Sequence, residues 1–236
     1  MARAIWSGAI SFGLVNIPVK LHSAVSHREV RFHMLHDADG ARIQLRRFCS
    51  AEGVEVPYEH IVKGYEIAKG RYVTVTSDEL EAADPKGAHA VDIQDFVDLG
   101  EIDPIYYDAT YYLAPDRGAG KAYGLLLEAM RRTGKVGIAR VVLRTRQQLC
   151  CVRPLGEALA LSTMNHADEI VSREDLDLPK ATPPAARELE MAERLVASLT
   201  APFDPARYPD EHREKVLALI ERKAAGEDVV APPQEA

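Results

Sequence analysis

Cysteine, tryptophan and long apolar runs are scarce in this 236-residue chain, which contains three Cys and one Trp. The three cysteines, Cys49, Cys150 and Cys151, are too few and too unevenly spaced for a disulfide framework, which fits a reducing compartment. Adjacent Cys150 and Cys151 would point to opposite faces of a strand, so we expect no bridge between them. No run approaches the roughly 18 apolar residues of a membrane span, and no signal peptide precedes Trp6. We therefore expect a cytoplasmic protein with no membrane association.

The charge of the chain is unevenly distributed. Hydrophobic residues make up 47% and charged residues 28%, as in an ordinary globular chain of one or two domains, and the formal net charge is −7. Between Asp78 and Asp116 there are eleven acidic residues and one lysine, whereas residues 129–156 contain seven basic residues and no acid. Because local fields govern binding more than total charge does, the basic stretch is a candidate surface for a polyanion.

The pattern of the chain changes near residue 180. Short alternating apolar runs broken by Gly, Pro and Asp predict a mainly β, barrel-like core over residues 1–180. One helix is expected at residues 121–132, ending at Gly134, and a short one near Ser77. The apolar stripe of the helix at 121–132 would be Ala122, Leu125, Leu126, Ala129 and Met130.

Beyond the proline-rich stretch 178–184, apolar stripes predict helices at 185–199 and 210–225. These helices form a C-terminal helical arm over residues 181–226, and residues 227–236 form a short, frayed tail.

The opening residues predict two extended runs joined by a turn. Ile10, Phe12 and Leu14 alternate with small residues, and the apolar parity then changes at Val15-Asn16. A strand that keeps one face buried can change parity only through a bulge or a turn.

Basic side chains follow strand alternation in two places. Residues 138–146 read as one strand with Ala139, Val141 and Leu143 on the apolar side. Its opposite side would carry arginines about 7 Å apart, comparable to a phosphate repeat, with no acidic neighbour. A charge run is usually a solvated face, but the absence of acids favours an anion partner. The candidates in this stretch are Lys135, Arg140, Arg144 and Arg146.

The earlier stretch repeats the pattern, with Ile43 and Leu45 opposite the cations. Its candidates are Arg31, Arg42, Arg46 and, with the other parity, Arg47. By contrast, Arg131 and Arg132 fall in the last turn of the predicted helix, where the macrodipole favours cations, and are interpreted as structural first.

Catalytic and metal patterns are weak. The loop Gly118-Ala-Gly-Lys121 fails two positions of the phosphate-loop signature. His33, His36 and Cys49 do not provide the four ligands of a structural zinc site. Asp92, Asp95 and Asp98 could hold a metal in a nuclease, but spaced surface acids are common. We predict no catalytic site, no metal and no cofactor.

Ordered segments along nearly the whole chain resemble one family, the bacterial Ku proteins. The opening residues 4–21 are similar to the start of these proteins, and further similar segments follow in family order from about residue 2 to 225. They include Arg31-Phe-His-Met-Leu-His36, Val62-Lys-Gly-Tyr-Glu66, Ile102-Asp-Pro-Ile-Tyr-Tyr107, Tyr111-Tyr-Leu-Ala-Pro115, Gly134-Lys-Val-Gly-Ile-Ala-Arg140 and Phe203-Asp-Pro205.

The resemblance implies a Ku-type β-barrel core that forms a ring as a homodimer and binds double-stranded DNA ends without sequence preference. It also implies recruitment of ligase D for non-homologous end joining, near the nucleoid, without catalysis. Two alternatives stay open. One is a metal- or nucleotide-dependent nucleic-acid enzyme using the acidic 78–116 stretch, and the other is a structural dimer whose arginines meet an acidic protein.

Overall fold

The structure is a computed structural model that describes residues 3–83, 89–143, 146–178 and 183–226. Contacts divide the chain into two units, each described separately. The barrel unit comprises residues 1–26 and 57–175, and the arm unit comprises residues 27–56 and 176–236. The boundaries predicted at 180 and 226 stay predictions, and the tail 227–236 lies outside the described residues.

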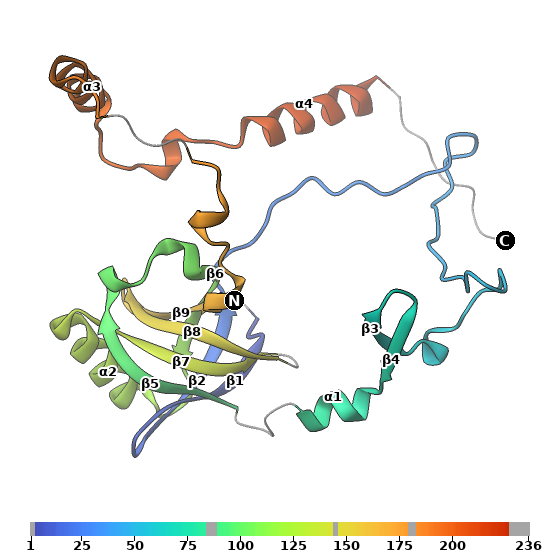
Figure 1. The fold of residues 1–236 in the computed structure, drawn as a ribbon, viewed down its shortest axis with the longest axis horizontal. Helices are drawn as coiled ribbons and strands as arrows, with labels where there is room; N and C mark the ends of the chain where they lie inside the picture. The colour runs from blue at the N-terminus through green and yellow to red at the C-terminus, as the bar shows by residue number, and fades with distance from the viewer. Residues whose placement is uncertain (1–2, 84–88, 144–145, 179–182, 227–236) are drawn as a thin grey trace. The chain divides into compact units, whose positions relative to one another are not determined.

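Seven strands within the described residues close into a barrel (Figure 1). Around the barrel they follow the order β1-β2-β6-β9-β8-β7-β5. This confirms the predicted mainly β core. The strands are β1 (Trp6–Phe12), β2 (Val15–Ser23), β5 (Ala90–Asp98), β6 (Tyr107–Pro115), β7 (Lys135–Leu143), β8 (Arg146–Leu155) and β9 (Ala158–Met164).

The barrel closes where β1 runs parallel to β5, with Ile10 opposite Val91. The neighbouring strands of the barrel otherwise pair antiparallel. Gly8 makes this closure possible, because a Cβ at that position would lie 2.1 Å from the carbonyl oxygen of His89. The amide of the next residue, Ala9, donates to that same oxygen at 2.8 Å.

Strand alternation produces the core. Inward-facing side chains from all parts of the barrel are fully buried, including Ile10, Ile17, Leu21, Val91, Leu113, Val141, Cys150, Val152, Leu159 and Leu161. The predicted parity change is confirmed, but the turn lies earlier than expected. It comprises Gly13 and Leu14, so Leu14 occupies the tip of the β1–β2 hairpin instead of continuing the strand.

Helix α2 (Gly120–Thr133) packs beside β7 and β8 and ends at Gly134, whose φ of 67° is left-handed, as predicted for a C′ glycine. Its buried face is Tyr123, Leu126, Leu127 and Met130. The predicted stripe was therefore partly wrong, because Leu125 is 73% exposed. The Tyr123 hydroxyl donates to the Leu113 carbonyl and accepts from the Leu159 amide, both at 2.6 Å, so it joins α2 to β6 and β9.

Outside the barrel, this unit also contains a small sheet with exposed aromatic side chains. Strands β3 (Lys63–Ala68) and β4 (Arg71–Val75) form a two-stranded sheet, followed by α1 (Ser77–Ala83), which confirms the short helix predicted near Ser77. Tyr65 and Tyr72 of this sheet are 72% and 62% exposed.

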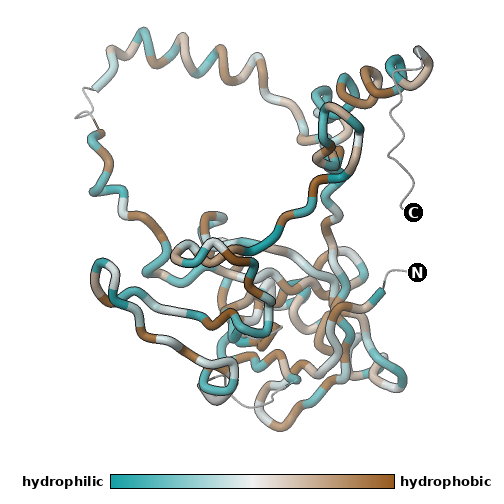
Figure 2. The backbone as a smooth tube through the Cα atoms, turned by 90° about the vertical axis from the view of Figure 1, so that its right-hand side faces the viewer, coloured by the Kyte–Doolittle hydropathy of each residue, from teal (hydrophilic) through white to brown (hydrophobic). Residues whose placement is uncertain are grey.

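The described part of the arm unit contains two α-helices, α3 (Ala186–Leu199) and α4 (Glu211–Ala225), close to their predicted bounds. Short 3-10 turns connect several elements: η1 (Tyr58–His60), η2 (Leu99–Glu101), η3 (Pro104–Tyr106), η4 (Ala167–Glu169), η5 (Arg173–Asp175) and η6 (Pro205–Arg207). Pairing described within residues 27–56 is limited to the bridges Leu35–Arg42 and Phe48–Glu55. Hydrophobic residues recur along these extended and helical segments (Figure 2), and they are exposed.

Candidate nucleic-acid interface

Strand β7 positions Arg140 on the outside of the barrel. Its neighbours Ala139 and Val141 face inward and are buried, whereas Arg140 is exposed, as the alternation predicted. However, Asp92 of β5 is the direct cross-strand neighbour of Arg140, so the expectation of no acidic neighbour was wrong. No ion pair involves Arg140 in the described part of the chain. Its guanidinium is available to another anion.

Arg146 does not share the face of Arg140. The predicted strand 138–146 is two strands, because β7 ends at Leu143 and β8 begins at Arg146 directly opposite it. Arg146 therefore has the inward parity of Gln148 and Cys150, and it is exposed because it lies at the mouth of the barrel. The chain therefore reverses direction between Leu143 and Arg146, and this reversal breaks the extrapolated alternation. Arg144 lies outside the described residues.

Lys135 starts β7 and is already paired. Its Nζ lies 2.8 Å from Oδ2 of Asp98, the residue directly opposite on β5. Both side chains are about half exposed, so this is a surface ion pair of small stabilising effect. A phosphate could therefore compete with Asp98 for Lys135.

The structure adds Arg153 on the outer wall of β8. It alternates with the buried core residue Val152 and is half-buried. The residues at the same level of the next three strands are Ala160 of β9, Tyr112 of β6 and His22 of β2. Sequence reasoning missed Arg153 as a site residue, because Cys151 and Val152 are adjacent apolar residues and alternation therefore does not indicate which side of the strand faces outward.

Arg140 and Arg153 therefore share the outer wall. Arg140 is opposite Leu149, and Arg153 lies four residues further along β8, a distance of about 13 Å along the strand. Between them lies Cys151, beside Tyr107. Burial raises the pKa of Tyr107 to about 12, with a further contribution from the Cys151 thiol, so both groups stay neutral at physiological pH.

The arginines of the arm unit lie on an extended segment instead of a strand. Arg46 is engaged within its own chain, through Glu55 at 2.9 Å and Gln44 at 3.2 Å. The expected apolar side is exposed, with Ile43 at 46% and Leu45 at 82%, so no core of described residues lies behind it. Arg31, Arg42 and Arg47 are exposed as well.

The structure explains the two helix-end arginines by contacts within the barrel unit. Arg131 donates to the Gly156 carbonyl and pairs with Glu157, and Arg132 donates to Glu128 at 2.7 Å. These contacts agree with the structural interpretation.

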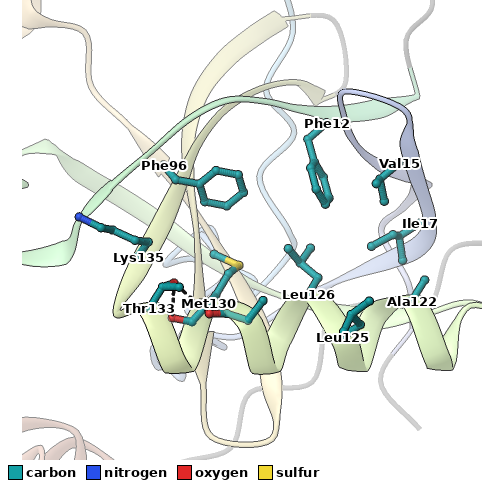
Figure 3. Close-up of a pocket in the computed structure, with 11 residues that line it drawn as sticks. Phe12, Val15, Ile17, Phe96, Ala122, Leu125, Leu126, Met130, Thr133 and Lys135 are labelled. Carbon is teal, nitrogen blue, oxygen red and sulfur yellow. Dashed lines mark hydrogen bonds between the residues drawn. The ribbon is translucent and has the colours of Figure 1, made fainter.

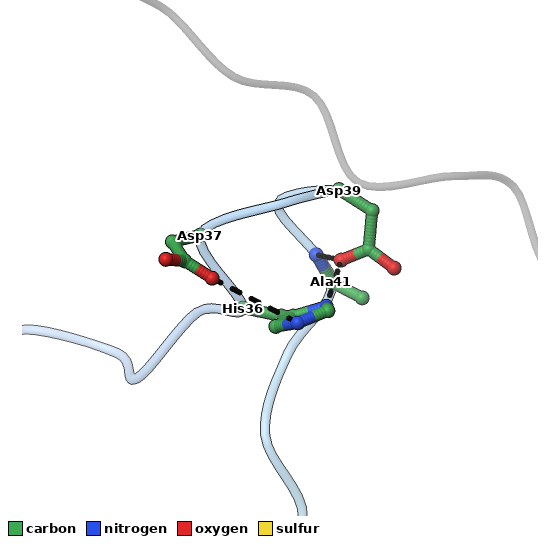
Figure 4. A network of polar contacts seen from close by, with 4 residues as sticks. All are labelled: His36, Asp37, Asp39 and Ala41. Atoms are coloured by element: carbon green, nitrogen blue, oxygen red, sulfur yellow. Dashed lines mark hydrogen bonds and ion pairs between the residues drawn. The ribbon is translucent and has the colours of Figure 1, made fainter.

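The histidine-containing loop is a local turn (Figure 4). Nδ1 of His36 lies 3.1 Å from Asp39, and its Nε2 lies 3.8 Å from Asp37. The Ala41 amide donates to the same Asp39 carboxylate at 2.9 Å. Within the described residues there is no group of three or more side chains placed to hold a metal ion.

The Gly118–Lys121 loop is an ordinary entry to α2. The helix begins after Ala119, whose amide donates to the Asp116 carbonyl at 3.0 Å. Asp116 is held in turn by the Nζ of Lys20 at 2.7 Å, and this hydrogen bond lowers the pKa of Asp116.

Comparison with known proteins identifies the family. A family model described as the Ku70/Ku80 beta-barrel domain matches residues 11–191. The chain belongs to the Ku family. Its relatives include the non-homologous end joining protein Ku of Anaeromyxobacter sp. (strain K), 69% identical over all of this chain and 80% of the relative. The proteins of the same name from Heliobacterium modesticaldum and Archaeoglobus fulgidus are 47% and 40% identical, over 99% and 97% of this chain and 85% and 90% of theirs.

The match covers the barrel strands from β2 to β9 and only the end of β1. None of the helices in the described part of the chain is both long and apolar enough to cross a bilayer.

Proposed function

We propose that this chain binds double-stranded DNA ends without sequence preference, as a ring-shaped homodimer, and serves non-homologous end joining. The observation that carries the proposal is the Ku barrel match over residues 11–191, together with relatives named for that process. In this role the protein works in the cytoplasm, at the nucleoid.

The arrangement of cations suits contacts to the DNA backbone. Arg140 and Arg153 stand on one outer wall and are separated along a strand, which allows them to contact different phosphates. Phosphate contacts position a protein on DNA but carry no sequence information. Arg31, Arg42, Arg46, Arg47, Lys135, Arg144 and Arg146 complete the proposed set of DNA-binding residues.

Exposed apolar side chains support an obligate homodimer. In residues 27–56, Phe32, Leu45 and Phe48 are 72%, 82% and 61% exposed, and on α3 Leu199 is 83% exposed. The β3–β4 sheet is similarly uncovered, although an isolated two-stranded sheet is marginally stable in water. A second copy that covers these surfaces would close the ring and stabilise the arms.

Ligase D is the proposed protein partner. The candidate docking surface is α4 and the residues that follow it, since Leu217, Leu219 and Ile220 of α4 are each at least 38% exposed. The same helix could instead contribute to the dimer.

The alternative of a metal-dependent nuclease or nucleotide enzyme is less well supported. Asp98 of β5 is paired with Lys135, and the described residues contain no group of three or more side chains placed to hold a metal ion. We propose that the protein requires no metal, no cofactor and no catalytic turnover.

The test compares binding to linear duplex DNA and to covalently closed circular duplex of the same sequence, at equal salt and with EDTA but no nucleotide. Threading onto ends predicts strong binding to the linear form and little to the circle. Equal affinity for the two forms would contradict the ring. Binding that requires a divalent cation and produces DNA cleavage would support the enzyme instead.

A further inference from the structure

Two pockets of the barrel unit differ in what their polar side chains do. The apolar pocket beside α2 (Figure 3) is lined by two polar side chains, Thr133 and Lys135, and both are engaged. Thr133 Oγ1 donates to the Ala129 carbonyl at 2.9 Å, and Lys135 pairs with Asp98. A second pocket lies at the mouth of the barrel and combines aromatic walls with polar side chains that are available to a ligand.

The mouth pocket is the open end of the barrel interior. Its volume is about 220 Å³, and it is lined by Ile5, Trp6, Tyr111, Leu143 and Gln148. The last four come from β1, β6, β7 and β8, and each has the inward parity of the buried core residues of its strand. Sites for drug-sized ligands have volumes of about 300–1,000 Å³. The mouth pocket is smaller, so it suits a single planar ring system.

The ring of Trp6 forms a fixed, flat wall of this pocket. It lies over Gly8, because a Cβ added at Gly8 would come within 2.3 Å of a carbon of the ring. The ring also meets that of His89, with the two centroids 6.4 Å apart. Both Trp6 and Tyr111 pack against the buried core of the barrel. A ring that is already ordered loses little conformational freedom when another ring stacks on it.

Two polar side chains at the mouth have no partner within the described part of the chain. Gln148 is half-buried and makes no side-chain hydrogen bond there, and its amide offers both donors and an acceptor. Two residues earlier on the same side of β8, the exposed Arg146 makes neither a hydrogen bond nor an ion pair with another described residue. The mouth therefore presents a stacking surface, an adaptable amide and a cation at its rim, which together match the base and the phosphate of one nucleotide.

A DNA strand on the outer wall passes close to this mouth. Arg140 lies three residues before Leu143, the last residue of β7, which is about 10 Å along the strand. That distance corresponds to about three base steps of a duplex. A DNA strand with one phosphate at Arg140 needs only a few more nucleotides to reach Trp6 and Gln148. An apolar protein side chain is a poorer occupant, because it would leave the Gln148 amide without a partner.

We infer that the mouth pocket, with Arg146 at its rim, binds an unpaired base from the single-stranded overhang of a DNA end. This inference rests on the proposed function, which brings such ends to the barrel. The base would stack on Trp6, Gln148 would hydrogen-bond to the edge of the base, and Arg146 would contact the phosphate. Stacking accepts every base, and the amide can present a donor or an acceptor, so overhangs of any sequence would be bound.

The single tryptophan of the chain makes the first experiment direct. Trp6 fluorescence is recorded while the full chain binds three short duplexes, which are blunt, carry a two-nucleotide thymine overhang, or carry the same overhang without its bases. Overhangs on the 3′ and the 5′ strand are tested separately. The overhang with bases should quench Trp6, because a base stacks on the indole ring, and the other two duplexes should not. It should also bind about tenfold more tightly than the abasic overhang.

Two neighbouring glutamines provide a matched pair of variants. Gln148→Ala should weaken binding to the overhang duplex about fivefold and leave binding to the blunt duplex unchanged. The control is Gln147→Ala, because Gln147 is exposed on the opposite side of β8 and should behave as wild type on both duplexes once replaced. Unchanged binding to blunt ends also shows that Gln148→Ala is folded.

The inference is overturned if neither overhang quenches Trp6, or if the blunt or abasic duplex quenches it as strongly. Equal effects of Gln147→Ala and Gln148→Ala on overhang binding would also overturn it. Quenching that follows protein concentration without DNA would assign the pocket to a side chain of a second copy instead. Each of these results leaves blunt-end binding, and with it the proposed function, intact. Loss of binding to all linear duplexes would contradict the proposed function itself.

Discussion

The seven-stranded barrel and the arm unit treat apolar side chains in opposite ways. In the barrel, Ile10, Leu21 and Leu113 have no solvent exposure. In the arm unit, Leu45, Leu199 and Phe203 are each more than 80% exposed. Buried apolar surface is the main source of folding free energy. The barrel therefore stabilises itself, whereas the arm unit has its apolar surface available for another molecule.

Substitution by alanine should reveal this difference most strongly. Leu113→Ala removes a fully buried side chain, and we expect it to lower the free energy of unfolding by about 2–5 kcal/mol. Leu199→Ala should leave barrel unfolding unchanged and weaken the dimer instead. Chemical denaturation and sedimentation of both variants separate the two effects. Equal destabilisation of the barrel by Leu199→Ala would show that α3 packs on its own barrel.

The next largest effect is expected at Tyr123. Its hydroxyl satisfies the Leu113 carbonyl and the Leu159 amide, so Tyr123→Phe leaves two buried backbone groups without this partner. We expect a loss of about 1–3 kcal/mol in unfolding free energy, with a fold unchanged by circular dichroism. Tyr65→Phe, at a 72% exposed position, is the control and should cost nothing measurable.

Much of the barrel could be predicted from the sequence, because strand alternation and helix ends depend on neighbouring residues. The helix ending at Gly134 and the inward parity of Ala139 and Val141 are examples. The predictions that failed were those that depended on where β7 ends and β8 begins. Extrapolating the alternation past Leu143 put Arg146 on the wrong side of the sheet and left Arg153 unassigned.

Features that depend on long-range packing could not be predicted from the sequence either. The exposure of Leu125 depends on which face of α2 packs on the barrel. The strand expected for residues 42–46 would need a neighbouring strand to pair with, and local sequence does not show one. Asp92 opposite Arg140 could not be anticipated, because it requires the β5–β7 register, which includes a bulge between Ile93 and Asp95.

Single arginine substitutions should show whether DNA contacts the outer wall of the barrel or its mouth. Arg140→Ala and Arg153→Ala should each weaken end binding alike on all sequences and lower the salt slope by about one phosphate contact. Arg146→Ala provides the comparison, because Arg146 has the opposite parity. A larger loss for Arg146 than for Arg140 would move the interface to the barrel mouth, and a sequence-dependent loss would indicate base readout.

The smallest expected effect is on alkaline stability. The pKa of Tyr107 is raised to about 12 in the folded chain, above its ordinary value of 10.0. Above pH 10 the unfolded tyrosine loses its proton while the folded one keeps it, so stability falls as pH rises through this window. Tyr107→Phe should therefore flatten the decline between pH 10 and 12, measured by thermal melts, whereas Tyr65→Phe should not. An unchanged slope would show that Tyr107 is not a source of the decline.

The central claim is that the barrel folds by itself but holds DNA only when the α3–α4 segment of the arm unit joins two copies. The most direct measurement determines the mass of complexes on a short linear duplex for the full chain and for a chain truncated after Leu178. The full chain should bind as two copies. The truncated chain should retain the cooperative unfolding of the barrel yet remain unbound. A truncated monomer that binds the duplex end with the affinity of the full chain would contradict the claim.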